Sequence, residues 1–294
     1  MRAGRLLAGG LLLAACSSST AGGGPGAPSP APGPPRPGAV TPTAGGRGRA
    51  VTYRPARSVE YRLERHDSLT LQYPGGATQE QIRDRIAHFH LTVAEASTAG
   101  TYQVLIVLDS LQALENGVPV PPDSIAAATG ARWTASLTPN GDLSPLKADR
   151  AGTLTDELTG RLQLLFPRLP AGGVRDGMEW TDSTSYKLVA DAFPGTEHVI
   201  TKYRAAGGAS EGKTVTLESA GSYTRSGTRV QGDQELQMAA AGSRHGAQQI
   251  GVDGIMLSSR GNDAGDMTIT VPAVGQTVPV KQSGSYSIVS TTSQ

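Results

Sequence analysis

Apolar and polar side chains alternate with a period of two residues along most of the chain after Val51, and this pattern restricts the fold most. In the run 59–64, Val59, Tyr61 and Leu63 alternate with charged residues. Such alternation is typical of strands with one buried face. Further alternating or β-branched runs cover 69–73, 89–93, 180–189, 198–203, 214–217, 250–257, 267–271 and 277–280. The sequence therefore predicts a mainly β domain.

Short turn signals separate these runs. Pro74-Gly75-Gly76 follows one of them, and Asn140-Gly141 and Asp253-Gly254 are two-residue hairpin signals of the type I′ class, in which both residues need positive φ. Strands joined by short turns pair in antiparallel fashion. We expect residues 51–294 to form one antiparallel β-rich domain, a size that is ordinary for a β-sandwich or barrel.

Helix signals are few. The clearest is 153–166, in which Thr153 and Asp156 suit the N-terminal cap and Pro167 ends the helix. One face of this helix carries four leucines: Leu154, Leu158, Leu162 and Leu165. They are candidates for a ligand-facing lid, and the simpler alternative is that they close an ordinary core. The run 124–128 adds a turn or two of helix, and 79–86 reads as a brief helical or irregular segment leading into a strand.

The stretch Gly207–Thr214, GGASEGKT, fits the phosphate-loop pattern G-x-x-x-x-G-K-[ST]. A phosphate loop joins a strand to a helix, because the helix N-terminus holds the phosphates. Here the following residues, from Thr214 to a break at Gly221, alternate as a strand does. The pattern favours a loop between two antiparallel strands, and we expect no nucleotide and no other cofactor.

The first sixteen residues, MRAGRLLAGGLLLAAC, have a basic start, a short apolar run and small residues before Cys16. The run is too short to span a bilayer, so it is read as an export signal, residues 1–15. Leu13-Ala14-Ala15-Cys16 resembles the lipobox of bacterial lipoproteins. That resemblance implies a Cys16 thiol carrying diacylglycerol, an acylated new N-terminus and a membrane anchor held by several acyl chains. Ser17 resembles an outer-membrane address in diderm bacteria, so we expect an exported protein anchored to the cell envelope.

Residues 16–50 are rich in Gly, Pro, Ala, Ser and Thr, and they predict a disordered tether between the lipid and the domain. Cys16 is the single cysteine, so the domain has neither a disulfide nor a catalytic thiol. Without Arg2 and Arg5 the chain has 24 basic and 25 acidic residues, a net charge of −1. That balance argues against nucleic acid as a partner.

Three further patterns were weighed for chemistry. Gly208–Gly212 contains the G-x-S-x-G of a nucleophile elbow, with Ser210 as nucleophile and His198 or His245 as its base, but that motif also needs a following helix. His88 and His90 share one strand face and lack a third metal ligand nearby, so a solvated face is favoured.

The acidic run 262–266 lacks the spacing of a calcium loop and is read as a turn. Trp133 and Trp180 are read as core residues. We therefore assign no catalytic residue and no metal ligand, and expect no enzyme activity; a secreted serine hydrolase using Ser210 stays a lesser alternative.

The combination of lipobox, tether, antiparallel strands and one amphipathic helix resembles bacterial envelope lipoproteins with an unclosed β-barrel, of the Lol-carrier and LppX-like type. The resemblance covers residues 51–294 as a pattern of elements. It implies an antiparallel curved sheet or half-barrel with one amphipathic helix, which encloses an apolar cavity for acyl chains. Two functions stay open: binding of a lipid or other apolar envelope ligand, and a structural or assembly role through protein contacts.

Overall fold

The structure is a computed structural model, and it describes residues 41–42, 47–73, 75–96, 100–188, 193–206 and 214–291. The chain divides into Met1–Gly33 and Pro34–Gln294, and every described residue lies in the second unit. The predicted signal and Cys16 therefore lie outside the described residues. In the part of the chain that is described, no helix is long and apolar enough to cross a membrane.

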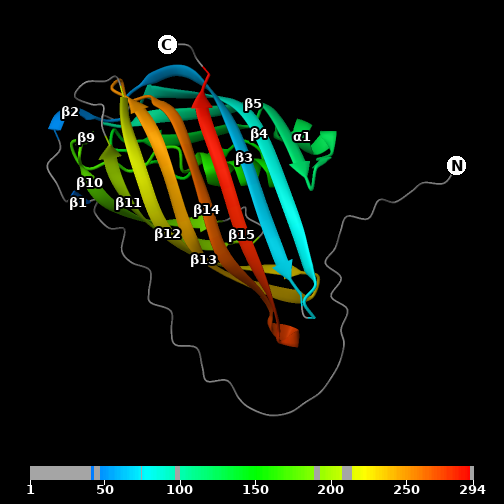
Figure 1. The fold of residues 1–294 in the computed structure, drawn as a ribbon. Helices are drawn as coiled ribbons and strands as arrows, with labels where there is room; N and C mark the ends of the chain where they lie inside the picture. The colour runs from blue at the N-terminus through cyan, green and yellow to red at the C-terminus, as the bar shows by residue number, and fades with distance from the viewer. Residues whose placement is uncertain are drawn as a thin grey trace. The chain divides into compact units, whose positions relative to one another are not determined.

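One large antiparallel sheet dominates the described chain (Figure 1). Its 13 strands follow the order β1-β10-β11-β12-β13-β14-β15-β3-β4-β5-β7-β8, with β6 beside β5, and β2 and β9 form a separate pair. The strands are β1 (Thr41–Pro42), β2 (Arg47–Val51), β3 (Ala56–Gln72), β4 (Thr78–Glu95), β5 (Tyr102–Glu115), β6 (Val118–Pro119), β7 (Arg132–Leu137), β8 (Lys147–Ala148), β9 (Val174–Asp176), β10 (Glu179–Leu188), β11 (Gly195–Ala206), β12 (Thr214–Gln231), β13 (Gln234–Gly251), β14 (Met256–Val271) and β15 (Gln276–Ser290).

The predicted fold class is confirmed: the protein is mainly β, and its antiparallel sheet is curved and does not close on itself. Most of the predicted strands are present, and several are longer than expected because two alternating runs merge into one strand. For example, β3 joins the runs 59–64 and 69–73, and Val59, Tyr61 and Leu63 on it are buried as predicted. The run 250–257 instead spans the turn between β13 and β14. Two strands, β1 and β2, lie upstream of the domain start predicted at residue 51.

Several local predictions were wrong. Residues 79–86 are strand throughout, because β4 pairs with β3 on one side and with β5 on the other. The helical spacing of the apolar residues in this segment was misleading. The buried side chains are those of Arg85, Ala87 and Phe89, which alternate as in a strand. β12 does not end at Gly221; it runs on to Gln231 because glycine at 221 lets neighbouring β11 approach closely, where a Cβ would lie 2.6 Å from the Ile200 carbonyl oxygen.

Residues 262–266 are not a turn; they lie inside β14, paired with both β13 and β15. The turns at Asn140-Gly141 and Asp253-Gly254 are present, but only the glycines have positive φ, so neither is of type I′. Asn116 and Gly117, between β5 and β6, do have positive φ at both residues, 52° and 75°. That hairpin was missed because its second strand has only two residues.

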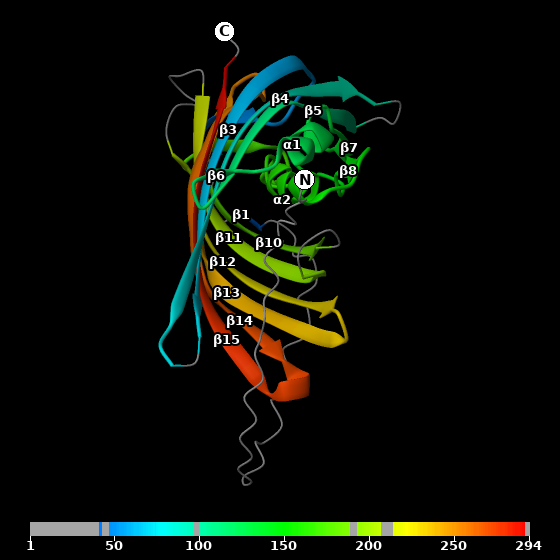
Figure 2. The same cartoon turned by 90° about the vertical axis from the view of Figure 1, so that its right-hand side faces the viewer.

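Two α-helices lie on the concave side of the sheet near one end (Figure 2). α1 (Pro122–Ala128) confirms the short helix read at 124–128. α2 (Thr153–Leu162) ends before Phe166, because the chain then turns to bury Leu165, whose carbonyl accepts a hydrogen bond from Gln248 Nε2 at 2.8 Å. Gly152, not Thr153, occupies the N-cap position of α2, and Asp156 lies in its first turn.

The core fills the space between these helices and the sheet. Its largest fully buried side chains include Trp133, Trp180, Tyr53, Tyr61, Phe89 and Ile106. Trp133 donates from Nε1 to Thr159 Oγ1 on α2 at 2.7 Å, and Trp180 donates to the Arg168 carbonyl at 2.9 Å. Both tryptophans are therefore core residues, as predicted, and each joins the sheet to the helical segment.

Paired glycines line the concave face of the central strands. Gly242 is opposite Gly265, and Gly246 is opposite Gly261. A Cβ on Gly261 would lie 2.7 Å from the His245 carbonyl oxygen and 2.8 Å from Tyr286 Cε1. Glycine at such positions lets a sheet bend sharply and lets an aromatic ring lie over the backbone. The curvature that encloses the helices depends on these positions.

We expect Gly261→Ala to lower the free energy of unfolding by about 1–3 kcal/mol, because the added methyl group meets backbone and cannot be accommodated without a shift. The control is Gly160→Ala on the exposed face of α2, where a Cβ meets nothing within 4 Å. That change should stabilise by about 0.5–1 kcal/mol. Denaturant unfolding of both variants provides the measurement, and a neutral Gly261→Ala would contradict the assigned role.

Candidate functional site

The side chains on the concave face change character along the strands. Beyond the helix-covered core comes a band of charged residues, which we call the charged belt. It consists of Arg65, Asp67, Arg85, Asp182, Glu197, Arg244 and Asp263 from the sheet, with Glu157 and Arg161 from α2. Neighbouring strands supply the sheet residues in register, for example Arg244 opposite Asp263, so the belt crosses the sheet from side to side.

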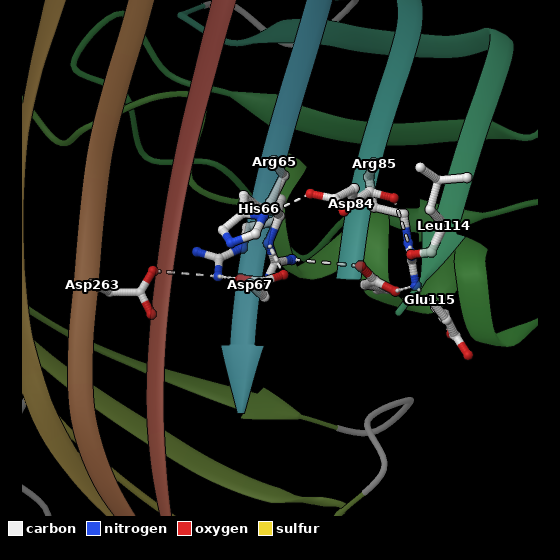
Figure 3. A network of polar contacts seen from close by, with 10 residues as sticks. Arg65, His66, Asp67, Asp84, Arg85, Leu114, Glu115 and Asp263 are labelled. Atoms are coloured by element: carbon white, nitrogen blue, oxygen red, sulfur yellow. Dashed lines mark hydrogen bonds and ion pairs between the residues drawn. The ribbon is translucent and has the colours of Figure 1, made fainter. Parts of the chain in front are cut away.

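Arg85 is the most deeply buried member of the belt, with 3% of its side chain exposed (Figure 3). Its guanidinium donates to the Leu114 carbonyl at 2.8 Å and lies 3.2 Å from Glu157 and 3.3 Å from Glu115. A buried charge needs a partner of opposite sign and hydrogen bonds. Arg85 has both, and through Glu157 it ties α2 to strands β4 and β5.

Arg65 and Arg161 form the middle of the belt. Arg65 Nε lies 2.6 Å from Asp67 Oδ2 and its NH1 lies 3.8 Å from Glu157. Burial, and then the nearby positive charge of Arg161, lower the pKa of Arg65 below its ordinary value. The pKa shift shows that two guanidinium groups share this space.

Arg161 is held by longer ion pairs than its neighbours. Its NH2 lies 3.5 Å from Asp263 and 3.9 Å from Asp67, both beyond ordinary hydrogen-bond distance. Only 16% of its side chain is exposed. The positive group therefore lies between two carboxylates, each at ion-pair distance.

Arg244 continues the belt on β13. Its NH1 lies 2.8 Å from Glu197 on β11, and its guanidinium carbon lies 4.5 Å above the centre of the Tyr223 ring. Burial lowers the pKa of Arg244, but the carboxylates of Glu197 and Asp263 outweigh that effect and raise it above the ordinary value. The group is thus a fixed positive charge, oriented by a ring and a carboxylate.

A cavity of about 120 Å³ lies between the segment after α2 and the sheet. Arg161, Arg168 and Arg244 line it, together with Asp182, Asp263 and neutral hydroxyl and amide groups. Arg168 lies 3.2 Å from Asp182. Burial, with the charge of Asp182, raises the pKa of Tyr186 on the cavity wall to about 12, so its hydroxyl stays protonated.

On the far side of the charged belt lies a second group of apolar side chains, which we call the apolar strip. It comprises Leu236, Met238, Ala240, Met267, Ile269, Val271, Val278 and Val280. Register places Met238, Ile269 and Val278 side by side. The strip lies towards the end of the sheet opposite the α-helices (Figure 2). Although Val271 is 1% exposed and Leu236 7%, neither belongs to the core cluster under the helices.

The four leucines predicted to face a ligand lie elsewhere. Leu154, Leu158, Leu162 and Leu165 are 7%, 6%, 2% and 2% exposed, and all belong to the core cluster. None of them is among the residues that line the cavity. In the structure these four leucines close the core, which is the simpler of the two interpretations given above.

The loop 207–213, with Ser210, lies outside the described residues. Its flanks are β11 and β12, which are antiparallel, so the prediction of a strand rather than a helix after the loop is confirmed. His198 Nδ1 lies 3.0 Å from Ser185 Oγ on the adjacent strand. His245 lies on β13, with β12 between it and His198's strand.

His88 and His90 share the face of β4 opposite its buried residues, as predicted. His90 Nδ1 lies 2.9 Å from Asp109 Oδ1 on β5. Among the described residues, no three His, Cys, Asp or Glu side chains gather into a group able to hold a metal ion. His90 therefore pairs with a residue of the neighbouring strand, and neither histidine is part of the belt.

Sequence reasoning missed the charged belt. A signal was present on β3, because Arg65 and Asp67 continue the odd-numbered positions of the buried Tyr61 and Leu63. A charged residue in phase with a buried face marks either a site or a buried ion pair. Asp263 was not recognised as a member of the belt, because residues 262–266 were predicted to form a turn.

Comparisons with known proteins add little. No protein-family model matches the chain, and no curated protein is similar to it. Among solved structures, OccK8 (OprE) of Pseudomonas aeruginosa is 8% identical, with a TM-score of 0.15, over 79% of this chain and 97% of that one. A similarity of that size carries no argument about fold or function.

We expect Arg85→Ala to cost about 3–5 kcal/mol of stability, because it leaves the Glu157 carboxylate without its buried partner. The matched control is Arg62→Ala on β3, whose pair with Glu64 is exposed, at 44% and 48%. An exposed pair contributes about 0–1 kcal/mol. Denaturant unfolding distinguishes the two, and equal losses would contradict a buried network.

Proposed function

We propose that the protein is a lipid-anchored protein of the cell envelope that binds the acyl chain of an amphiphile on the concave face of its sheet. The observation that carries the proposal is the apolar strip, which is a second apolar surface apart from the core. Apolar clusters in a domain usually comprise one contiguous core and smaller satellites, and the strip lies outside the core cluster under the helices. Here the charged belt stands between the two.

The neighbouring cavity supports a ligand with a polar end. Ligand sites are concave, with apolar walls and a few polar groups that fix orientation. The concave face offers both, since the strip is apolar and the cavity beside the belt has charged and hydroxyl-bearing walls. An amphiphile matches this arrangement better than a wholly apolar or a wholly polar ligand.

The N-terminal sequence supports the location. The lipobox-like Leu13–Cys16 and the segment that follows it imply a domain held close to a membrane. The folded part begins by Arg47, and Thr41–Pro42 already pair with β10, so the tether is shorter than the 16–50 segment. The domain would therefore work near the surface that supplies amphiphiles.

An assembly role has one observation in its favour. Among the described strands, β1 covers only Trp180 and Thr181 of the outer edge of β10, and residues 182–188 have no strand beside them on that edge. An uncovered edge can accept a strand from another protein. Purified protein that binds no lipid but forms defined complexes with envelope proteins would favour this function instead.

The proposal is tested with the mature chain, residues 16–294, produced without its signal so that Cys16 carries no lipid. Native mass spectrometry and uptake of a fluorescent fatty-acyl probe should show bound lipid. Met238→Asp should lower probe affinity at least about tenfold, since a charge in an apolar site costs more than 1.4 kcal/mol. The control is Ala239→Asp, the next residue on the exposed opposite face. Equal uptake by both variants would contradict binding at the strip.

The anchor is tested separately, with the whole chain expressed in a bacterium that processes lipoproteins. We expect a mature N-terminus at Cys16, carrying diacylglycerol and an N-acyl group, and recovery in the membrane fraction. Cys16→Ser should lose the lipid mass, because a hydroxyl is not nucleophilic enough to accept the lipid in place of the thiolate. An unmodified N-terminus on the unsubstituted protein would contradict the lipoprotein assignment.

A further inference from the structure

We propose that the cavity beside the charged belt is a binding site for a phosphate group, with Arg161 and Arg244 as its two ligands. This inference rests on the proposed function and names the polar end of the amphiphile.

Arg161 brings a guanidinium to the cavity wall. A guanidinium carries five N–H donors. The carboxylates of Asp263 and Asp67 lie 3.5 Å and 3.9 Å from its NH2, longer than an ordinary hydrogen bond. Because the side chain is only 16% exposed, an acceptor that enters the cavity would meet a partly dehydrated donor group.

Arg244 presents a second guanidinium to the same cavity in a fixed orientation. Glu197 holds one of its edges at 2.8 Å, and the Tyr223 ring supports its face at 4.5 Å. Asp263 faces both arginines, so one carboxylate is shared between two positive groups. Among the residues that line the cavity, three arginines face two aspartates, and the buried Nε of Arg244 has no hydrogen-bond partner among the described residues.

The chemistry of these donors selects an oxyanion. Two planar guanidinium groups match the oxygens of a phosphate, and charge-assisted bonds of this kind are stronger than neutral ones. The cavity, about 120 Å³, is also lined by the Tyr203 and Tyr286 side chains, whose hydroxyls can donate as well. The burial-raised pKa of Tyr203 keeps its hydroxyl protonated.

The position of the cavity connects it to the apolar strip. Arg244, Ala240 and Met238 lie on one strand and point to one face, because all are at even positions of β13. At about 3.4 Å per residue, Met238 is about 20 Å from Arg244 along the strand. A phosphate at Arg244 would thus direct an attached acyl chain over the strip, so the ligand class is a lipid with a phosphate headgroup.

The test compares two lipids with identical chains, dioleoyl phosphatidic acid and dioleoylglycerol, on the mature chain 16–294. We expect a preference of about tenfold or more for the phosphate lipid, the size of one charge-assisted bond. Arg161→Met should remove most of this preference, because it weakens binding of the phosphate lipid more than binding of dioleoylglycerol. Arg161→Lys should restore only part of the preference because the planar fork is lost. The control is Arg260→Met on the exposed face of β14, which should keep the full preference.

The outcomes separate the two proposals. Equal affinities in the unsubstituted protein, or a preference that survives Arg161→Met, would overturn the phosphate site while acyl-chain binding stands. Failure of both lipids to bind would overturn the proposed function and this inference with it. Inorganic phosphate that binds as tightly as the phosphate lipid would assign the cavity to free phosphate and overturn the lipid class. Unfolding midpoints confirm that the Arg161 variants remain folded.

Discussion

The structure depends on the bending of one sheet around a pair of helices. A flat sheet of 13 strands would expose one apolar face to water, whereas the curved sheet places Phe89, Trp133 and Trp180 around α2. Bending needs positions where neighbouring strands come close on the inner side, and the opposed glycines of β13 and β14 provide them. Bulkier residues there would push the strands apart, and the helices would lose their covering.

Electrostatics then limits how far the core extends. The apolar interior stops where Glu157 and Arg161 of α2 meet Arg85, Asp67 and Asp263 of the sheet. A buried ion network contributes little net stability compared with apolar packing, but it fixes the partners that can meet. In this protein it fixes the position of α2 against three strands, β3, β4 and β14, and leaves a separate concave surface beyond it. That surface does not take part in closing the core.

Period-two alternation predicted the fold class because successive side chains of a strand point to opposite faces, so a strand with one buried face alternates apolar and polar residues. It failed where an inner side chain was not apolar: Gly221 suggested a strand end and Asp263 suggested a turn, although both lie inside long strands. Composition around a residue cannot show that the opposite strand supplies a matching group. The cavity was unpredictable for the same reason. The register of β13 and β14 places Arg244 opposite Asp263, and Arg161 reaches Asp263 only because α2 packs on the sheet.

The way the chain enters the domain has a mechanical consequence. The first described residues pair as two short strands, β1 with β10 and β2 with β9, at the margin of the fold. Tension applied at the N-terminus reaches the two-residue β1 pairing first, then β2, and then β3, a long central strand paired on both sides. Pulling would therefore first break the few backbone hydrogen bonds of β1, which would lengthen the tether between membrane and domain. The curved sheet would keep its shape under loads that detach only this first strand.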